Sequence, residues 1–131
     1  QVTVVFDCDR EYCLMYGDYG RLRQMFLVIL DNAVKFSNEG GEVKVQITKG
    51  DKLTIRIKDN GIGIAPEELP FVFDKFYKSK LRQNAKGSGL GLAIAKQIAL
   101  KHEGTIDIHS ELSKGTEFIF RFRPIDEEEF V

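Results

Sequence analysis

Every strong strand candidate in this sequence alternates apolar with polar residues, and this alternation constrains the fold more than any other feature. In residues 43–48, Val43, Val45 and Ile47 alternate with polar side chains. The same pattern recurs in the candidate strands at residues 53–58, 106–109 and 118–123. Such strands bury one face and expose the other, whereas the strands of a doubly wound Rossmann sheet are covered on both faces. The pattern therefore predicts an α+β two-layer sandwich, with a mixed, mostly antiparallel sheet and helices packed on one face.

Two segments have the periodicity of amphipathic helices. The first follows a candidate N-cap, Asp18, and its apolar stripe consists of Leu22, Met25, Phe26, Ile29, Leu30 and Ala33. The second begins near Leu90, with Ile94 and Ile98 spaced by four. We also expect two short N-terminal strands, at residues 2–6 and 12–16, and a short helix after Pro66 within the long loop of residues 61–86.

The composition fits one globular domain, which we place at residues 1–125, followed by a solvated acidic tail at residues 126–131. The chain has 131 residues, of which 43% are hydrophobic. Its net charge is −1 and its basic residues are spread out, so we expect no nucleic-acid partner. No apolar run approaches the ~20 residues that span a bilayer. Cys8 and Cys13 match neither zinc nor thioredoxin spacing.

Three glycines, Gly87, Gly89 and Gly91, lead directly into the second helix. Glycines at a helix start are typical of phosphate binding by backbone N–H groups. The spacing matches neither the P-loop, which needs Gly-Lys-Ser/Thr, nor the Rossmann fingerprint, whose third glycine would fall at Leu92. Close packing at the helix start is an equally good explanation of the glycines alone.

Polar residues on apolar faces are a second indication of a ligand. Asp59 continues the buried parity of the strand at residues 53–58, and Thr116 shares the parity of the phenylalanines near the C-terminus. Asn32 lies at the rim of the first helix stripe, with Lys35 further round the same side. Each has an ordinary alternative: Asp59 can cap the following Asn-Gly turn, and Lys35 can extend to solvent. One ATP site would account for all of them.

The order of these motifs resembles the catalytic and ATP-binding domain of sensor histidine kinases, in the GHKL superfamily with the Bergerat fold. LDNAVKF (30–36) resembles the asparagine box, DNGIGI (59–64) the first glycine box and FVFDKFYK (71–78) the phenylalanine box. GSGLGLAIA (87–95) resembles the second glycine box, and SKGTEFIF (113–120) the closing Gly-Thr segment. The similarity extends over about residues 12–123.

The resemblance assigns a role to each matched position. Asp59 accepts the adenine amine, with Thr116 acting through water on the same edge, while Gly61, Gly63 and Ile64 shape the pocket and Phe36 packs near the base. Asn32 is the expected Mg²⁺ ligand, and Asn32 and Lys35 are the expected catalytic pair. An ATP lid is expected at about residues 75–87. The remaining nucleotide-binding positions are Phe76, Lys78, Lys86, Gly87, Ser88, Gly89, Leu90 and Gly91.

By the same resemblance, the domain transfers the γ-phosphoryl group of ATP to a histidine on a separate helical dimerisation and phosphoacceptor domain, and a response regulator receiver domain acts next. It would be the cytoplasmic part of a membrane-bound sensor, without membrane contact of its own. Neither His102 nor His109 resembles the phosphoacceptor. Val28 stands where many relatives carry a second polar residue, and the lid is short and rich in lysine. A binding-only module is therefore the alternative. A GHKL serine kinase is a further option, which the well-matched phenylalanine box disfavours.

Overall fold

The computed structural model of the chain describes residues 2–8, 15–38, 40–75, 77 and 90–125. One sheet contains strands in the order β1-β2-β3-β5-β4. The strands are β1 (Thr3–Cys8), β2 (Glu42–Lys49), β3 (Leu53–Asp59), β4 (Thr105–Glu111) and β5 (Gly115–Phe122). The helices are α1 (Tyr19–Phe36) and α2 (Gly91–Lys101), with a short 3₁₀ helix, η1 (Leu69–Phe71), after Pro66.

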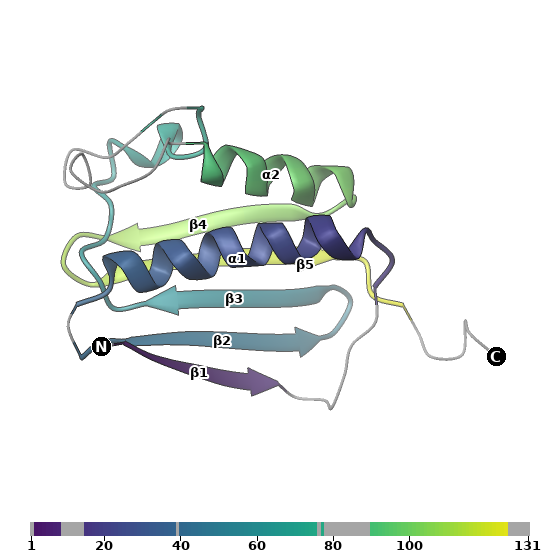
Figure 1. Ribbon diagram of the computed structural model, residues 1–131, viewed down its shortest axis with the longest axis horizontal. Coiled ribbons are helices and arrows are strands. Elements are labelled where there is room, and N and C mark those ends of the chain that lie inside the picture. Colours follow the sequence, from purple (N-terminus) through teal and green to yellow (C-terminus); the bar gives the residue numbers. More distant parts are fainter. Residues whose placement is uncertain (1, 9–14, 39, 76, 78–89, 126–131) are drawn as a thin grey trace.

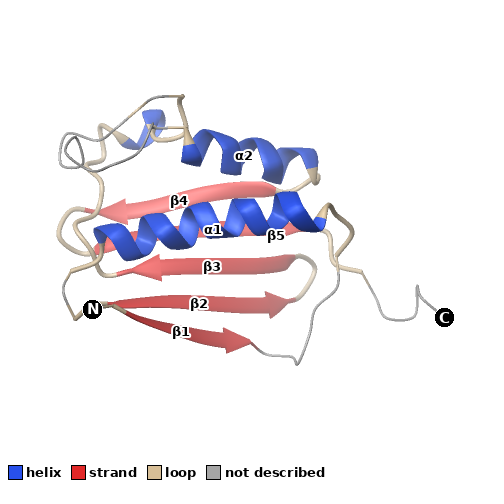
Figure 2. Ribbon diagram, in the orientation of Figure 1, coloured by secondary structure: helices blue, strands red, loops and turns tan. Residues whose placement is uncertain are grey.

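The helices α1 and α2 lie side by side on one face of the sheet (Figures 1 and 2). The pairs β2–β3, β3–β5 and β4–β5 are antiparallel, and β1–β2 is parallel. The predicted two-layer α+β sandwich with a mixed, mostly antiparallel sheet is therefore confirmed. Within the described part of the chain, neither helix combines the length and the hydropathy that crossing a bilayer requires.

Of the two N-terminal strands expected at residues 2–6 and 12–16, the first is present. It runs from Thr3 to Cys8 and pairs in parallel with β2, while Met15 and Tyr16, which were expected in the second, lie outside any strand. Residues 12–14 lie outside the described part of the chain. Alternation identifies a strand but not its partner, and here a distant strand offered the hydrogen-bonding edge.

Asp18 caps α1, as its position predicts. Its side-chain Oδ1 accepts a hydrogen bond from the Arg21 N–H at 3.1 Å, which satisfies one of the unpaired donors of the first turn. The helix then buries Met25, Ile29 and Ala33 against the sheet. The partner face is built by the phenylalanines of β5, all fully buried: Phe118, Phe120 and Phe122.

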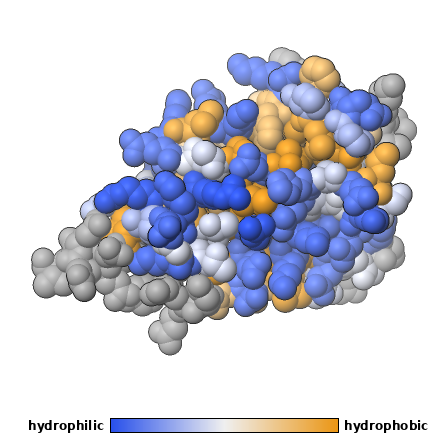
Figure 3. All heavy atoms as spheres, turned by 180° about the vertical axis from the view of Figure 1, so that it is seen from behind, coloured by the Kyte–Doolittle hydropathy of each residue, from blue (hydrophilic) through white to orange (hydrophobic). Residues whose placement is uncertain are grey.

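The opposite face of the sheet is mainly hydrophilic (Figure 3). Ile119 points to this face by its parity in β5, yet it is fully buried. Its register partners Arg56 and Asp107 form ion pairs with Glu117 and Arg121, at 3.4 and 2.8 Å. The stems of such long charged side chains cover apolar surface while their ends stay in water. The open face is therefore wet, with one apolar residue beneath its ion pairs.

Candidate nucleotide site at the strand ends

Asp59 ends β3 with a carboxylate that is almost completely buried, at 1% exposure. Its Oδ1 accepts hydrogen bonds from the Gly61 N–H at 2.8 Å and from the Thr116 N–H at 3.3 Å. The first bond is the turn cap that the Asp-Asn-Gly sequence suggests, so that interpretation is correct for this oxygen. The second joins β3 to β5, which a turn cap alone does not require. Burying a carboxylate is costly, and two N–H donors offset part of that cost.

Thr116 is equally buried, at 2% exposure, and its hydroxyl has a partner that the motif analysis did not single out. Ser110 of β4 lies directly opposite in register, and the two hydroxyl oxygens are 2.8 Å apart. The Ser110 Oγ also accepts the Ile64 N–H at 2.8 Å. Ser110 has the parity of Ile106 and Ile108, so the argument that identified Thr116 would have identified Ser110 as well.

The glycines of the first glycine box make room for the protein's own backbone. A Cβ on Gly61 would lie 2.0 Å from the Phe36 carbonyl oxygen, at the end of α1. Gly63 has φ +74°, and a Cβ there would lie 2.1 Å from the Glu111 carbonyl oxygen. The resemblance implies that these glycines shape the nucleotide pocket, but contact between three segments of the chain already requires them. This packing holds the loop after β3 against both α1 and the β4–β5 turn.

Asn32 and Lys35 lie on the last turns of α1, beside this loop. The Asn32 amide nitrogen Nδ2 is buried and has no hydrogen-bond partner among the described residues. A buried unsatisfied donor costs about 1–3 kcal/mol, so its retention suggests a ligand. The Lys35 side chain is 39% exposed, and its Nζ is 3.8 Å from Asp31 Oδ2.

The start of α2 meets α1 one turn before Asn32. Leu90 is the N-cap of α2, and a Cβ on Gly91 would lie 3.1 Å from Val28 Cγ1. Val28, Asn32 and Phe36 follow one another at intervals of four residues along α1. The same helix side therefore meets the α2 start at one end and the glycine-box loop at the other. The remaining predicted contacts lie outside the described residues: Phe76, Lys78, Lys86, Gly87, Ser88 and Gly89.

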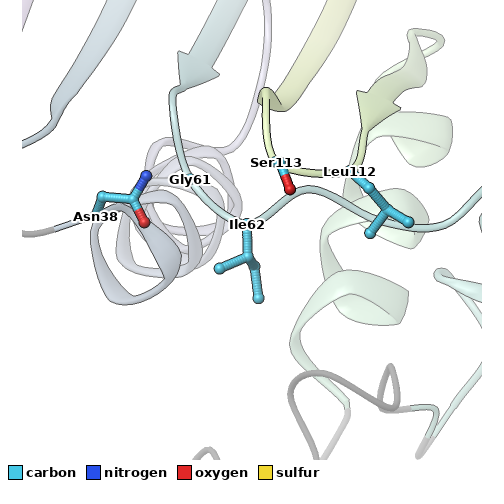
Figure 4. Close-up of a pocket in the computed structure, with 5 residues that line it drawn as sticks. All are labelled: Asn38, Gly61, Ile62, Leu112 and Ser113. Atoms are coloured by element: carbon cyan, nitrogen blue, oxygen red, sulfur yellow. The ribbon is translucent and has the colours of Figure 1, made fainter.

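An open hollow of about 440 Å³ lies at the same end of the sheet, between α1 and the β4–β5 turn (Figure 4). Its lining residues are Asn38, Gly61, Ile62, Leu112 and Ser113. Only Gly61 belongs to the predicted nucleotide site, and neither the Asp59 nor the Asn32 side chain lines the hollow. The hollow is therefore a neighbouring feature of the loop and not the predicted site itself.

The phenylalanine box packs onto the sheet and onto α2. Phe73 contacts Phe118 edge to face, with ring centroids 6.4 Å apart, and Lys96 Nζ of α2 lies 5.2 Å from the Phe73 ring centroid. Further along, the Tyr77 hydroxyl donates to Glu68 Oε1 at 2.5 Å. Burial and this carboxylate raise the pKa of Tyr77 to about 12. Two anchors thus hold the phenylalanine box, one of them at the start of the predicted lid.

Tyr77→Phe should reduce the loss of stability at alkaline pH. Because the pKa of Tyr77 is raised from 10.0 to about 12 in the folded chain, the folded state keeps a proton that the unfolded state releases between these values. The stabilisation from Tyr77 is therefore complete below pH 10.0 and is lost as the pH rises towards about 12.

The measurement is the free energy of unfolding in urea at about pH 9 and about pH 11 for both proteins. The advantage of the wild type should shrink at the higher pH. Tyr19→Phe is the matched control, since the Tyr19 ring is exposed. A constant difference between wild type and Tyr77→Phe would contradict the assignment.

The two histidines lie at the end of α2 and on β4. His102 caps the C-terminus of α2, where Nε2 accepts the Asp18 N–H at 3.0 Å and Nδ1 lies 2.8 Å from the Ile98 carbonyl oxygen. His109 is exposed on β4. The ring of His102 thus joins the end of α2 to the start of α1. Such a role is structural.

Comparison with known proteins identifies the family of the chain. Residues 17–125 match the family described as histidine kinase-, DNA gyrase B-, and HSP90-like ATPases. The chain is 44% identical over 104 residues to the signal transduction histidine-protein kinase/phosphatase MprB of Mycolicibacterium vanbaalenii, covering 78% of this chain and 22% of that protein. It is 35% identical over 124 residues to the sensor histidine kinase YkoH of Bacillus subtilis, covering 93% of this chain and 27% of that protein.

Solved structures are similar over nearly the whole chain. A mycobacterial sensor histidine kinase MprB structure superimposes with a TM-score of 0.85 at 33% identity, covering 95% of this chain and 86% of that one. Full-length ShkA in complex with AMPPNP gives a TM-score of 0.79 at 29% identity, covering 94% of this chain and 26% of that one. The chain spans only about a quarter of the length of the curated relatives named above. It belongs to the histidine kinase-, DNA gyrase B- and HSP90-like ATPase family, as the ATP-binding domain of the sensor histidine kinase type.

Proposed function

We propose that this domain binds Mg-ATP and transfers the γ-phosphoryl group to a histidine on a separate helical dimerisation and phosphoacceptor domain. A response regulator receiver domain would then take the phosphoryl group. The observation that carries the proposal is the buried Asp59 carboxylate, held by two backbone N–H groups beside Thr116 at the end of an apolar core. An acceptor in such a position suits the exocyclic amine of adenine. The parent protein would be a membrane-bound sensor with this domain on its cytoplasmic side.

Asn32 fits the role of a magnesium ligand. Its amide nitrogen Nδ2 is a buried donor without a partner among the described residues, which a phosphate oxygen would satisfy. Its carbonyl oxygen is the type of ligand that Mg²⁺ prefers, and the ion would keep part of its water. In the described part of the chain, no three His, Cys, Asp or Glu side chains gather into a metal site, so the nucleotide phosphates would supply further ligands. The ion would neutralise charge on the phosphates. The Asn32 carbonyl oxygen would position it.

The chain's own residues then mainly bind and orient, as phosphoryl transfer requires. Asp59 would fix the base, and Lys35, at the exposed end of α1, would reach the phosphates. The backbone N–H groups at the start of α2 would bind them too, a place where the helix dipole favours anions. By the same proposal, the lid and the glycines before Leu90, most of which lie outside the described residues, would complete the site.

Phosphotransfer with the parent protein tests the proposal. The chain, mixed with γ-labelled ATP, Mg²⁺ and the parent's phosphoacceptor domain, should label that domain, and the chain alone should not label itself. The label should be acid-labile and stable to base, as expected for phosphohistidine. An acid-stable label would instead indicate a serine kinase. Upstream of Gln1, the parent should carry two long amphipathic helices, with a histidine followed closely by an acidic residue on the first.

A binding-only module is the second candidate, and Val28 is the observation that favours it. Val28 is apolar and packs beside Gly91, so this turn of α1 offers no second polar ligand. Under this alternative, calorimetry would detect nucleotide binding, but no phosphoacceptor domain would become labelled. Labelling at a normal rate would reject it.

A further inference from the structure

We infer that Ser110 is a positioning residue, which orients the Thr116 hydroxyl so that the proposed nucleotide site accepts an amino-substituted base and rejects a keto-substituted one. The inference rests on the proposed nucleotide binding and names a determinant of its base specificity. Ser110 and Thr116 are register partners on β4 and β5, with their hydroxyl oxygens 2.8 Å apart.

The contacts of Ser110 determine which hydroxyl donates. A serine hydroxyl has one proton and two lone pairs. One lone pair of Ser110 Oγ accepts the Ile64 N–H at 2.8 Å. Its proton goes to the Gly115 carbonyl oxygen at 3.0 Å, a group that can only accept. The one remaining capacity of Ser110 is the second lone pair, so the Thr116 hydroxyl is the donor of the bond between them.

The opposite direction would be less favourable. If Ser110 donated to Thr116, the Gly115 carbonyl would lose this donor and the Thr116 proton would need another acceptor. Thr116 is only 2% exposed, and an unpaired buried hydroxyl is costly. The first arrangement gives both hydroxyl protons an acceptor and uses both lone pairs of the Ser110 oxygen. It leaves the Thr116 oxygen able only to accept.

Two acceptors therefore stand together at the end of the sheet. The Thr116 N–H donates to Asp59 Oδ1 at 3.3 Å, so the carboxylate and the Thr116 oxygen are neighbours. A carboxylate and an accept-only hydroxyl complement an exocyclic amine, which carries two N–H donors. They repel a keto oxygen, which has none. A Thr116 hydroxyl that was free to rotate could instead donate to that keto oxygen.

The base preference of the intact chain tests this role. ADP and IDP differ in the amine of adenine and the keto oxygen of hypoxanthine, so the ratio of their dissociation constants measures the preference. Ser110→Ala should lower the preference for ADP by about five- to tenfold, the effect expected from one hydrogen bond. A purely structural role would weaken both ligands together and leave the ratio unchanged, which would overturn the inference.

Three further variants test whether Ser110 acts on the base preference through the Thr116 hydroxyl. In a Thr116→Val background, Ser110→Ala should not change the ratio further, because the hydroxyl that it orients is gone. Ser110→Thr keeps a hydroxyl at this position, so its ratio of dissociation constants should equal that of the wild type. Thr105→Ala removes a hydroxyl from an exposed position of the same strand and should have no effect. An additive effect of Ser110→Ala in the valine background would contradict action through Thr116.

If Ser110→Ala fails to fold, the same ratio is measured with Ser110→Cys. The thiol is a weak donor and acceptor, so it should lower the ratio by an intermediate amount. An unchanged ratio in a folded Ser110→Cys chain would count against the inference. The outcome is separable from the proposed function: if the wild type does not bind ADP, nucleotide binding itself is wrong. If ADP binds and the ratio never changes, only the role of Ser110 is wrong.

Discussion

Asp59→Asn should abolish detectable ADP binding, with an affinity loss of about a hundredfold or more, while the chain stays folded. The carboxamide keeps one oxygen, which can still accept the N–H groups of Gly61 and Thr116. Its other group is an NH₂ donor, which would meet the donor amine of adenine. Isothermal calorimetry measures the affinity, and far-ultraviolet circular dichroism checks the fold. Unchanged affinity would reject Asp59 as the adenine acceptor.

Asp59→Ala is the informative contrast to this variant. It removes the shared acceptor and leaves two backbone N–H groups unpaired in a buried place. We therefore expect the free energy of unfolding to fall by about 2 kcal/mol or more, in addition to the loss of binding. If Asp59→Asn were as unstable as Asp59→Ala, the carboxylate charge itself would be needed for folding.

Asn32→Leu should weaken Mg-dependent ATP binding by about tenfold or more, and metal-free binding much less. The same change should leave stability unaltered or raise the free energy of unfolding by about 1 kcal/mol, because it removes a buried donor without a partner among the described residues. Leucine has the same branched arrangement of heavy atoms as asparagine and a larger volume, so the change creates no cavity. ATP titrations with Mg²⁺ and with chelator, together with urea unfolding, measure both effects.

Gln24→Leu is the matched control, since Gln24 is an exposed amide on the same helix. It should alter neither nucleotide affinity nor its dependence on metal. Equal losses by Asn32→Leu with and without Mg²⁺ would show that the amide serves the nucleotide rather than the ion. A marked loss of stability would show that it has a structural role.

The layered architecture could be predicted because the alternation of apolar and polar residues within each strand shows that one of its faces is buried. Alternation at Val43, Val45 and Ile47 shows that one face is wet whatever the strand pairs with, and the structure confirms a sheet covered on one side. Strand pairing could not be predicted in the same way. Thr3–Cys8 joined β2 in parallel, since the hydrogen-bonding edges of strands are alike in every sequence.

The candidate site, too, could be predicted only in part from the sequence. Asp59 and Thr116 stand out in the sequence because each puts a polar group on an apolar face, and both are buried. Ser110 carries the same signal at the end of a shorter alternation, but its importance depends on the cross-strand partner, which the sequence does not give. The packing role of Gly61 and Gly63 could not be predicted either, because the backbone groups that approach them belong to segments distant in the sequence.

By itself, the sequence determined the layers, the caps and the residue types that an ATP site needs, because periodicity and side-chain chemistry are local properties. The tertiary structure decided which groups share one hydrogen bond network. Asp59 Oδ1 serves a turn and a neighbouring strand at once, and the buried amide nitrogen of Asn32 has no partner among the described residues. Such relations depend on distances between segments far apart in the chain, and folding alone sets those distances.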